Sequence, residues 1–259
     1  MTSNLAGIRA FILDLDGVLT DTARTHRRAW KRMFDEFLRE RRGREAEPFT
    51  DEDYRRFVDG KPRYDGAASF LESRGIDLPY GEPEDPPERE TVCGLGNRKN
   101  RYFQELLERE GVERIEPSLG WVRRVRTSGI PMAVVTSSRN GRRVLAAAGI
   151  EELFDARVDG AVGDELELPG KPHPAYFLEA AERLGVRPAD AAVVEDAQSG
   201  VEAGRRGGFG LVIGVDRDGG GRLREAGADV VVRDLSELPL PGDARRSSDP
   251  RAADAARSP

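Results

Sequence analysis

The chain has 259 residues, of which 38% are hydrophobic and 34% are charged, a balance typical of a soluble globular protein with one large domain or a domain carrying an insertion. Its formal net charge of -6 argues against a nucleic-acid partner. The single cysteine, the lack of a signal peptide and the lack of an apolar run of roughly 20 residues favour a cytoplasmic protein with no membrane partner.

The first predicted element is a buried strand over residues 11–15 (FILDL), and it carries an unusual pair of acids. Asp14 and Asp16 stand two residues apart, so on a strand their side chains point the same way. Two carboxylates on one face repel each other and resist burial. Alternatively, the two aspartates could simply be a helix N-cap and a turn residue, but such a pair is better explained by a bound cation or by a role in catalysis.

Residues 22–111 read as helical. Apolar residues at helical spacing mark one face of a first helix, Thr50 and Asp53 have the spacing of a capping box, and a further helix is predicted around residues 100–111. The proline-rich, acidic stretch 78–90 is predicted to be an exposed loop. Because no apolar strand run falls in this part, we predict a small helical domain inserted directly after the first strand.

Four more apolar runs follow, at residues 131–136, 191–195, 210–215 and 229–232, separated by helical patterns that end in glycine. This alternation predicts an α/β fold with a Rossmann-like parallel sheet core. The predicted division is a core formed by residues 1–21 and 112–238, a helical cap over 22–111, and a disordered tail over 239–259.

Chemically useful side chains follow the predicted strands. In an open α/β sheet, ligands bind beyond the carboxyl ends of the strands. Acids, hydroxyls and a lysine that meet there suit phosphoryl transfer, in which a hard cation such as Mg²⁺ takes oxygen ligands and a lysine holds phosphoryl oxygens. The candidates, in chain order, are Asp14, Asp16, Thr136, Ser137, Ser138, Arg139, Asn140, Lys171, Glu195 and Asp196.

These motifs, in this order, resemble the haloacid dehalogenase superfamily of phosphotransferases. The resemblance is carried by DLDGV at residues 14–18, TSS at 136–138, the lysine of GKPHP and VVED at 193–196, and it spans roughly residues 8–235. Within that superfamily, TDTARTHRRAW, GKPRYDG, RKN and SSRNG look like the corresponding segments of β-phosphoglucomutases. Plain phosphatases of the superfamily share the aspartates, but less often this whole set.

The resemblance implies a role for each site residue. Asp14 would be the nucleophile and Asp16 the general acid and base. The resemblance further implies metal ligands at Asp14, Asp16, Glu195 and Asp196, contacts to the transferring phosphoryl group from Thr136, Ser137 and Lys171, contacts to the distal phosphate from Arg63, Ser138, Arg139 and Asn140, and a coupling of cap closure to Asp16 through His26 and Lys99.

Some positions depart from the pattern or have a plainer interpretation. Gly66 stands where the family often has a cap-loop serine, Arg139 where it often has lysine, and Ser137 where it often has alanine. Taken alone, His26 would be a packing or surface histidine, and Lys99 would belong to a solvated face.

The resemblance therefore implies a Mg²⁺-dependent β-phosphoglucomutase, which interconverts β-D-glucose 1-phosphate and D-glucose 6-phosphate through an aspartyl phosphate and glucose 1,6-bisphosphate. The partners would be the sugar phosphate and the bisphosphate, and we expect a monomer. One alternative is a sugar-phosphate phosphatase, in which water resolves the aspartyl phosphate. Another, from a different class, is a non-catalytic domain that binds sugar phosphate or another protein.

Overall fold

The computed structural model describes residues 5, 7–43, 47–217, 219 and 221–240; most of the predicted tail, residues 241–259, lies outside this part. One sheet holds six parallel strands in the order β3-β2-β1-β4-β5-β6. The strands are β1 (Ala10–Asp14), β2 (Met132–Val135), β3 (Ala156–Val158), β4 (Ala191–Glu195), β5 (Leu211–Val215) and β6 (Val230–Val232). The parallel α/β prediction is confirmed, and the five predicted strands match to within about one residue at each end.

The edge strand β3 was not predicted. It contains only three residues, and Arg157 at its centre interrupts the apolar run that marks the other strands. Arg157 forms an ion pair with the buried carboxylate of Asp159, which caps the following helix by accepting from the backbone N–H groups of Ala161 and Val162. The edge of a sheet tolerates such a strand because one side of it has no neighbour.

Helices cover both faces of the sheet. Phe11 and Leu13 pack toward α5 (Glu116–Thr127), where Trp121 meets the Phe11 ring edge-on at 5.0 Å, whereas Ile12 packs with Phe177 on the opposite face. The strands are apolar on both faces for this reason. The other helices of this part are α6 (Gly141–Ala148), α7 (Gly160–Glu165), α8 (Ala175–Arg183), α9 (Gln198–Arg206) and α10 (Arg222–Glu225), with short 3-10 turns η2 (Glu151–Leu153), η3 (Pro188–Asp190) and η4 (Leu235–Glu237).

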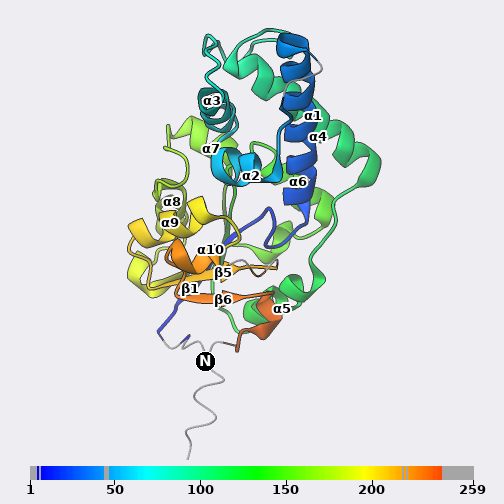
Figure 1. Cartoon of the computed structure of the whole chain (residues 1–259). Coiled ribbons are helices and arrows are strands. Elements are labelled where there is room, and N and C mark those ends of the chain that lie inside the picture. Colours follow the sequence, from blue (N-terminus) through cyan, green and yellow to red (C-terminus); the bar gives the residue numbers. More distant parts are fainter. Residues whose placement is uncertain (1–4, 6, 44–46, 218, 220, 241–259) are drawn as a thin grey trace, which may run out of the picture.

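The helical region follows β1 in the chain and lies beyond the carboxyl ends of the strands (Figure 1). It consists of α1 (Thr22–Arg42), α2 (Asp51–Asp53), the π-helical turn η1 (Tyr54–Val58), α3 (Arg63–Ser73) and α4 (Val92–Glu110). The rings of Phe34, Phe49 and Phe70 pack at its centre, with centroids 4.2–5.0 Å apart. The last helix begins earlier than predicted, because the Thr91 hydroxyl accepts from the Gly94 N–H and caps it.

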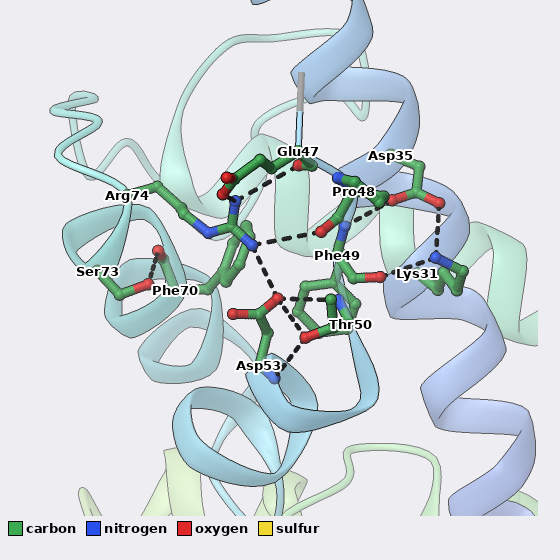
Figure 2. Close-up of polar contacts among 10 residues, drawn as sticks. All are labelled: Lys31, Asp35, Glu47, Pro48, Phe49, Thr50, Asp53, Phe70, Ser73 and Arg74. Carbon is green, nitrogen blue, oxygen red and sulfur yellow. Dashed lines mark hydrogen bonds and ion pairs between the residues drawn. The ribbon is translucent and has the colours of Figure 1, made fainter. Parts of the chain in front are cut away.

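The predicted capping box is present at Thr50 and Asp53, and it belongs to a larger polar cluster (Figure 2). The Arg74 guanidinium donates to Asp53 Oδ2 at 2.8 Å and to the Pro48 carbonyl at 3.3 Å, and it lies over the Phe70 ring. The segment before α2 is therefore joined both to α2 and to α3. The stretch 78–90 is without helix or strand, as predicted, and most of its side chains are exposed, but Asp85 is buried.

Two short segments connect the helical region to the sheet, and they lie side by side. The Asp21 N–H donates to the Glu113 carbonyl at 2.9 Å, and the Ile115 N–H donates to the Leu19 carbonyl at 2.9 Å. The two connecting segments therefore form a narrow double linker between the helical region and the sheet part. No helix in the described part of the chain is long and apolar enough to cross a membrane.

Candidate active site

All of the predicted site residues line one cavity between the helical region and the carboxyl ends of the strands. Those from the sheet side follow β1, β2 and β4 or lie in the loop before α8, and those from the helical side lie on α1, α3 and α4. They are Asp14, Asp16, His26, Arg63, Lys99, Thr136, Ser137, Ser138, Arg139, Asn140, Lys171, Glu195 and Asp196. The sequence therefore identified residues that the fold brings together from across the chain.

Asp14, Lys171 and Glu195 form a buried charged group at the floor of this cleft. The Lys171 ammonium contacts Asp14 Oδ1 at 2.5 Å and also Glu195 Oε1. Burial disfavours the Lys171 charge, but the two carboxylates outweigh it and keep its pKa above the ordinary value. Burial, against the opposing effect of Lys171, raises the pKa of Asp14, and Glu195 and Asp16 raise it further.

Asp16 lies beside this group and is held by hydroxyl groups. Thr22 donates to its Oδ1 at 2.5 Å, and Thr136 donates to its Oδ2 at 2.6 Å. Burial acts to raise the pKa of Asp16, but the interaction with His26 and the two hydroxyl hydrogen bonds prevail and hold it below the usual range. The carboxylate of Asp16 is thus stabilised in its ionised form, whereas that of Asp14 is not.

The glycine after the two aspartates has a structural reason. Gly17 has φ +88°, in the left-handed region that side chains other than glycine rarely adopt. A Cβ on Gly17 would lie 1.8 Å from Asp196 Oδ2. A residue with a side chain at this position would therefore displace Asp196 from the acids at the strand ends.

The donors at the strand ends fit a hard divalent cation. Burial raises the pKa of Asp196 well above its usual value, and Asp59, Glu195 and Asp14 raise it further, so negative charge is in excess here. Within the described residues, no three His, Cys, Asp or Glu side chains stand close enough together to ligate one metal. Mg²⁺ does not need three, because it is commonly held by one or two carboxylates, with waters and substrate phosphate as further ligands.

A buried lysine and histidine approach Asp16 from the helical side. Lys99 Nζ lies 2.6 Å from His26 Nδ1, and His26 Nε2 lies 3.4 Å from Asp16 Oδ1 without forming a hydrogen bond. The His26 ring stacks on Phe103 at 3.9 Å. Burial and the neighbouring Lys99 lower the pKa of His26 to about 4, and burial also lowers the pKa of Lys99. Both residues are buried, which excludes a solvated face for Lys99 and a surface position for His26.

The far end of the cleft is lined by amides and arginines. Arg63 donates to Asn97 Oδ1 at 3.2 Å and to Asn100 Oδ1 at 2.9 Å, and Asn140 donates to the same Asn100 oxygen at 2.9 Å. Arg139 is more exposed and forms an ion pair with Asp164 at 2.7 Å. This end is thus rich in hydrogen-bond donors.

The helical region is docked against the sheet part. Ser137 donates to the Gly60 carbonyl at 2.8 Å, and Ser199 donates to the Asp59 carbonyl at 3.0 Å. A Cβ on Gly170 would lie 2.1 Å from the Pro62 ring, so the two surfaces leave no room for a side chain there. The cleft measures about 70 Å³, below the roughly 300 Å³ at which most ligand pockets begin, so the structure is in a closed arrangement.

Sequence reasoning missed several residues of the cleft. Asp59 lines it, and burial followed by the charge of Glu195 raises the pKa of Asp59 to about 6. Thr22 and Asn100 stand behind the cleft lining and hold Asp16 and Arg63 respectively; both lie inside the segments TDTARTHRRAW and RKN, but neither was assigned a role from the sequence. Gly66 lies within α3 facing Val58 rather than in a loop, and it does not line the cleft.

An all-parallel sheet with paired aspartates after β1, a hydroxyl after β2, a buried lysine and a further pair of acids after β4 defines a phosphotransferase type of site. Comparison with known proteins supports this class. Residues 8–208 match the haloacid dehalogenase-like hydrolases, and the chain belongs to that family.

Individual members of this family are similar over most of the chain. The chain is 50% identical over 239 residues to a β-phosphoglucomutase from Mycobacterium bovis, which covers 89% of this chain and 91% of that one. It is 34% identical over 234 residues to a β-phosphoglucomutase from Bacillus subtilis, covering 90% and 92% of the two chains. A crystal structure of a β-phosphoglucomutase from Clostridium difficile superimposes with a TM-score of 0.72 at 26% identity, covering 90% and 93%.

Proposed function

We propose that this protein is a Mg²⁺-dependent mutase that interconverts β-D-glucose 1-phosphate and D-glucose 6-phosphate through an aspartyl phosphate and glucose 1,6-bisphosphate. The observation that carries the proposal is that one closed cleft is lined by two sets of groups that suit phosphate, Lys171 with Thr136 at the floor and Arg63 with Asn140. A bisphosphate needs both sets at once. The identity of 50% to a β-phosphoglucomutase supports the choice of sugar.

Asp14 is the proposed nucleophile. Its carboxylate attacks phosphorus, the bond to the leaving sugar oxygen breaks, and an aspartyl phosphate forms. The ammonium of Lys171, 2.5 Å from Asp14 Oδ1, is placed to hold a phosphoryl oxygen as negative charge builds up. The hydroxyls of Thr136 and Ser137 now donate to Asp16 and to the Gly60 carbonyl, and in the mutase they turn toward the transferring phosphoryl group.

Asp16 is the proposed general acid and base. As base it takes the proton from the attacking sugar hydroxyl, and as acid it returns a proton to the leaving oxygen. His26 and Lys99 are the proposed positioning residues: Lys99 holds the His26 ring through Nδ1, and the other ring nitrogen faces Asp16. Because both come from the helical region, Asp16 meets this pair only when the region is docked.

Mg²⁺ would be held by Asp14, the backbone carbonyl of Asp16, and Asp196 with Glu195 nearby. When bound, the ion would neutralise the excess negative charge at the strand ends and polarise the phosphoryl group. The chain's own residues bind, orient and move the protons.

The distal phosphate is assigned to Arg63, Ser138, Arg139 and Asn140. Arg63 offers a planar fork that suits phosphate, and Asn100 now occupies one of its nitrogens. The first transfer passes the phosphoryl group from phospho-Asp14 to the sugar hydroxyl and gives the bisphosphate. The bisphosphate then turns over, so that the phosphate from the distal end meets Asp14. We further propose that residues 22–111 act as a cap that opens for this exchange, with the sheet part as the core, and that the protein works as a monomer.

A phosphorus NMR time course with β-glucose 1-phosphate, Mg²⁺ and a trace of glucose 1,6-bisphosphate tests this function. Growth of the glucose 6-phosphate signal without free phosphate supports the mutase. Free phosphate as the main product would instead establish a sugar-phosphate phosphatase. No change in either signal, with the Asp14→Asn variant behaving identically, would favour a non-catalytic binding domain.

A further inference from the structure

A second cavity lies behind the acids of the cleft, on the other side of Gly17 and Asp196. Its volume is about 310 Å³, within the range of small-molecule pockets and larger than the closed cleft. We call it the arginine cavity. Its lining includes five arginines: Arg24, Arg27, Arg55, Arg217 and Arg222.

The cavity gathers cations from distant parts of the chain. Five arginines face four aspartates, and Asp59 and Asp196 stand in the wall shared with the cleft. Asp216 accepts the backbone N–H groups of Gly219 and Gly221, so its charge is already engaged. Arg24 and Arg27 come from α1, Arg55 from η1, Arg217 from the segment after β5 and Arg222 from the start of α10, so that the arginines reach the cavity from both the helical region and the sheet part.

Two of these arginines lack a partner within the described part of the chain. Arg24 and Arg222 form no side-chain hydrogen bond or ion pair with a described residue. The other three are engaged only in part: Arg27 lies over the Tyr54 ring at 5.3 Å and near the charge of Asp59, Arg55 forms an ion pair with Glu52 at 3.2 Å, and Arg217 donates to the Gly17 carbonyl. The Nε atoms of Arg27 and Arg55 are buried and donate to nothing in the described structure. A buried donor without an acceptor destabilises the fold unless a ligand or water supplies one.

The start of α1 adds to the positive potential. The helix begins at Thr22 with no acidic residue in its first turn and no side-chain cap from Asp21. The N-terminal end of a helix carries partial positive charge, and cationic side chains there are unfavourable by themselves. Arg24 and Arg27 are placed at this end all the same, so a bound anion would offset the repulsion at the helix start.

We propose that the arginine cavity is a second anion site, which takes a small molecule carrying phosphate groups. Guanidinium forks suit phosphate oxygens, and a concave space of this size suits a compact anion better than a polymer. Occupancy would join Arg55 of the helical region to Arg222 of the sheet part through one ligand. The site shares Asp59 and Asp196 with the cleft, but its arginines take no part in the proposed catalytic chemistry.

Calorimetric titration with pyrophosphate tests the site in the full chain. The test variant is the double substitution Arg24→Gln/Arg222→Gln, because neither side chain holds another part of the described structure. A matched control, Arg124→Gln/Arg142→Gln, removes the same charge from two exposed helical positions outside both cavities. A third variant, Arg63→Gln, weakens the cleft alone.

We expect a binding event that is at least tenfold weaker in Arg24→Gln/Arg222→Gln and unchanged in both the control and Arg63→Gln. Affinity in the double variant equal to that of the unmodified chain, with a folded protein by circular dichroism, would overturn the proposal. Loss of the event in Arg63→Gln alone would assign it to the cleft and likewise overturn it. Competition by fructose 1,6-bisphosphate would identify phosphosugars as the source of the anion, whereas competition by inorganic phosphate alone would identify the free ion.

Discussion

The two sides of the cleft differ in charge and in origin. The sheet side is dominated by carboxylates that follow β1 and β4, with Lys171 as the buried cation among them. The helical side contributes the cationic or basic residues Arg63, His26 and Lys99, with Asp59 as an acid among them. Strand ends fix their side chains in a rigid sheet, whereas the helical side reaches the site only through docking and a narrow double linker.

This difference suggests a division of labour. The rigid side suits the steps that need fixed geometry, the attack on phosphorus and the binding of a cation. The docked side suits the steps that must be reversed in every turnover, namely the proposed contact of Arg63 with the distal phosphate and the alignment of Asp16. Substitutions on the two sides should therefore affect different steps, and the predictions below run from the largest expected effect to the smallest.

Asp14→Asn should abolish turnover, with a loss of ~10⁴-fold or more, because the amide oxygen cannot form the phosphoenzyme. It should also prevent labelling of the protein by a small phosphate donor such as acetyl phosphate. The measurement is the rate of glucose 6-phosphate formation together with acid-quenched phosphoenzyme. Thermal unfolding should show no loss of stability, because the substitution relieves crowding among buried carboxylates. Residual phosphoenzyme in this variant would assign the nucleophile elsewhere.

Lys99→Met should lower kcat by ~10²-fold, because His26 loses the group that holds its Nδ1 and Asp16 loses its alignment. Labelling of Asp14 by acetyl phosphate should be almost unaffected, since that reaction needs the sheet side only. His26→Gln should behave in the same way. Equal loss of labelling and of turnover in Lys99→Met would contradict the division between the two sides.

Asp53→Ala should destabilise the helical region by about 1–2 kcal/mol at neutral pH, because it removes the capping box and the Arg74 contact. Burial acts to raise the pKa of Asp53, but Thr50 and Arg74 hold it below its ordinary value of 3.8. A lowered folded-state pKa gives stability that is present above the unfolded pKa and lost as the pH falls below it. The difference between the two proteins in urea unfolding should therefore shrink below about pH 4, and a constant difference would exclude the carboxylate as its source.

The sheet could be predicted well from the sequence, since continuous apolar runs mark strands that are buried on both faces. The strand β3 was not predicted because it has only three residues and Arg157 interrupts its apolar run. The residues after the strands were also predictable, because the carboxyl ends of parallel strands share one edge. By contrast, Asp59 contacts Ser199 and Asn100 contacts Asn140 only when the helical region docks on the sheet part, and no periodicity or spacing records such contacts.

The arginine cavity could not be predicted from the sequence for the same reason. Its cations are spread over residues 24–222, each of them within a segment that reads as ordinary solvated surface. Only the crossing of the chain between the two parts brings Arg24, Arg55 and Arg222 to one space.

The central claim is that the cleft holds two phosphate sites, and the partition of product in Arg63→Gln tests it most directly. The glucose 6-phosphate and free phosphate formed from β-glucose 1-phosphate would be measured in the same sample by phosphorus NMR. The account predicts that glucose 6-phosphate formation falls by ~10²-fold or more, that free phosphate becomes a larger share of the product, and that Arg63→Lys recovers part of the loss. An unchanged rate and an unchanged ratio of the two products would contradict the account, because the distal phosphate would then need no grip from the helical side.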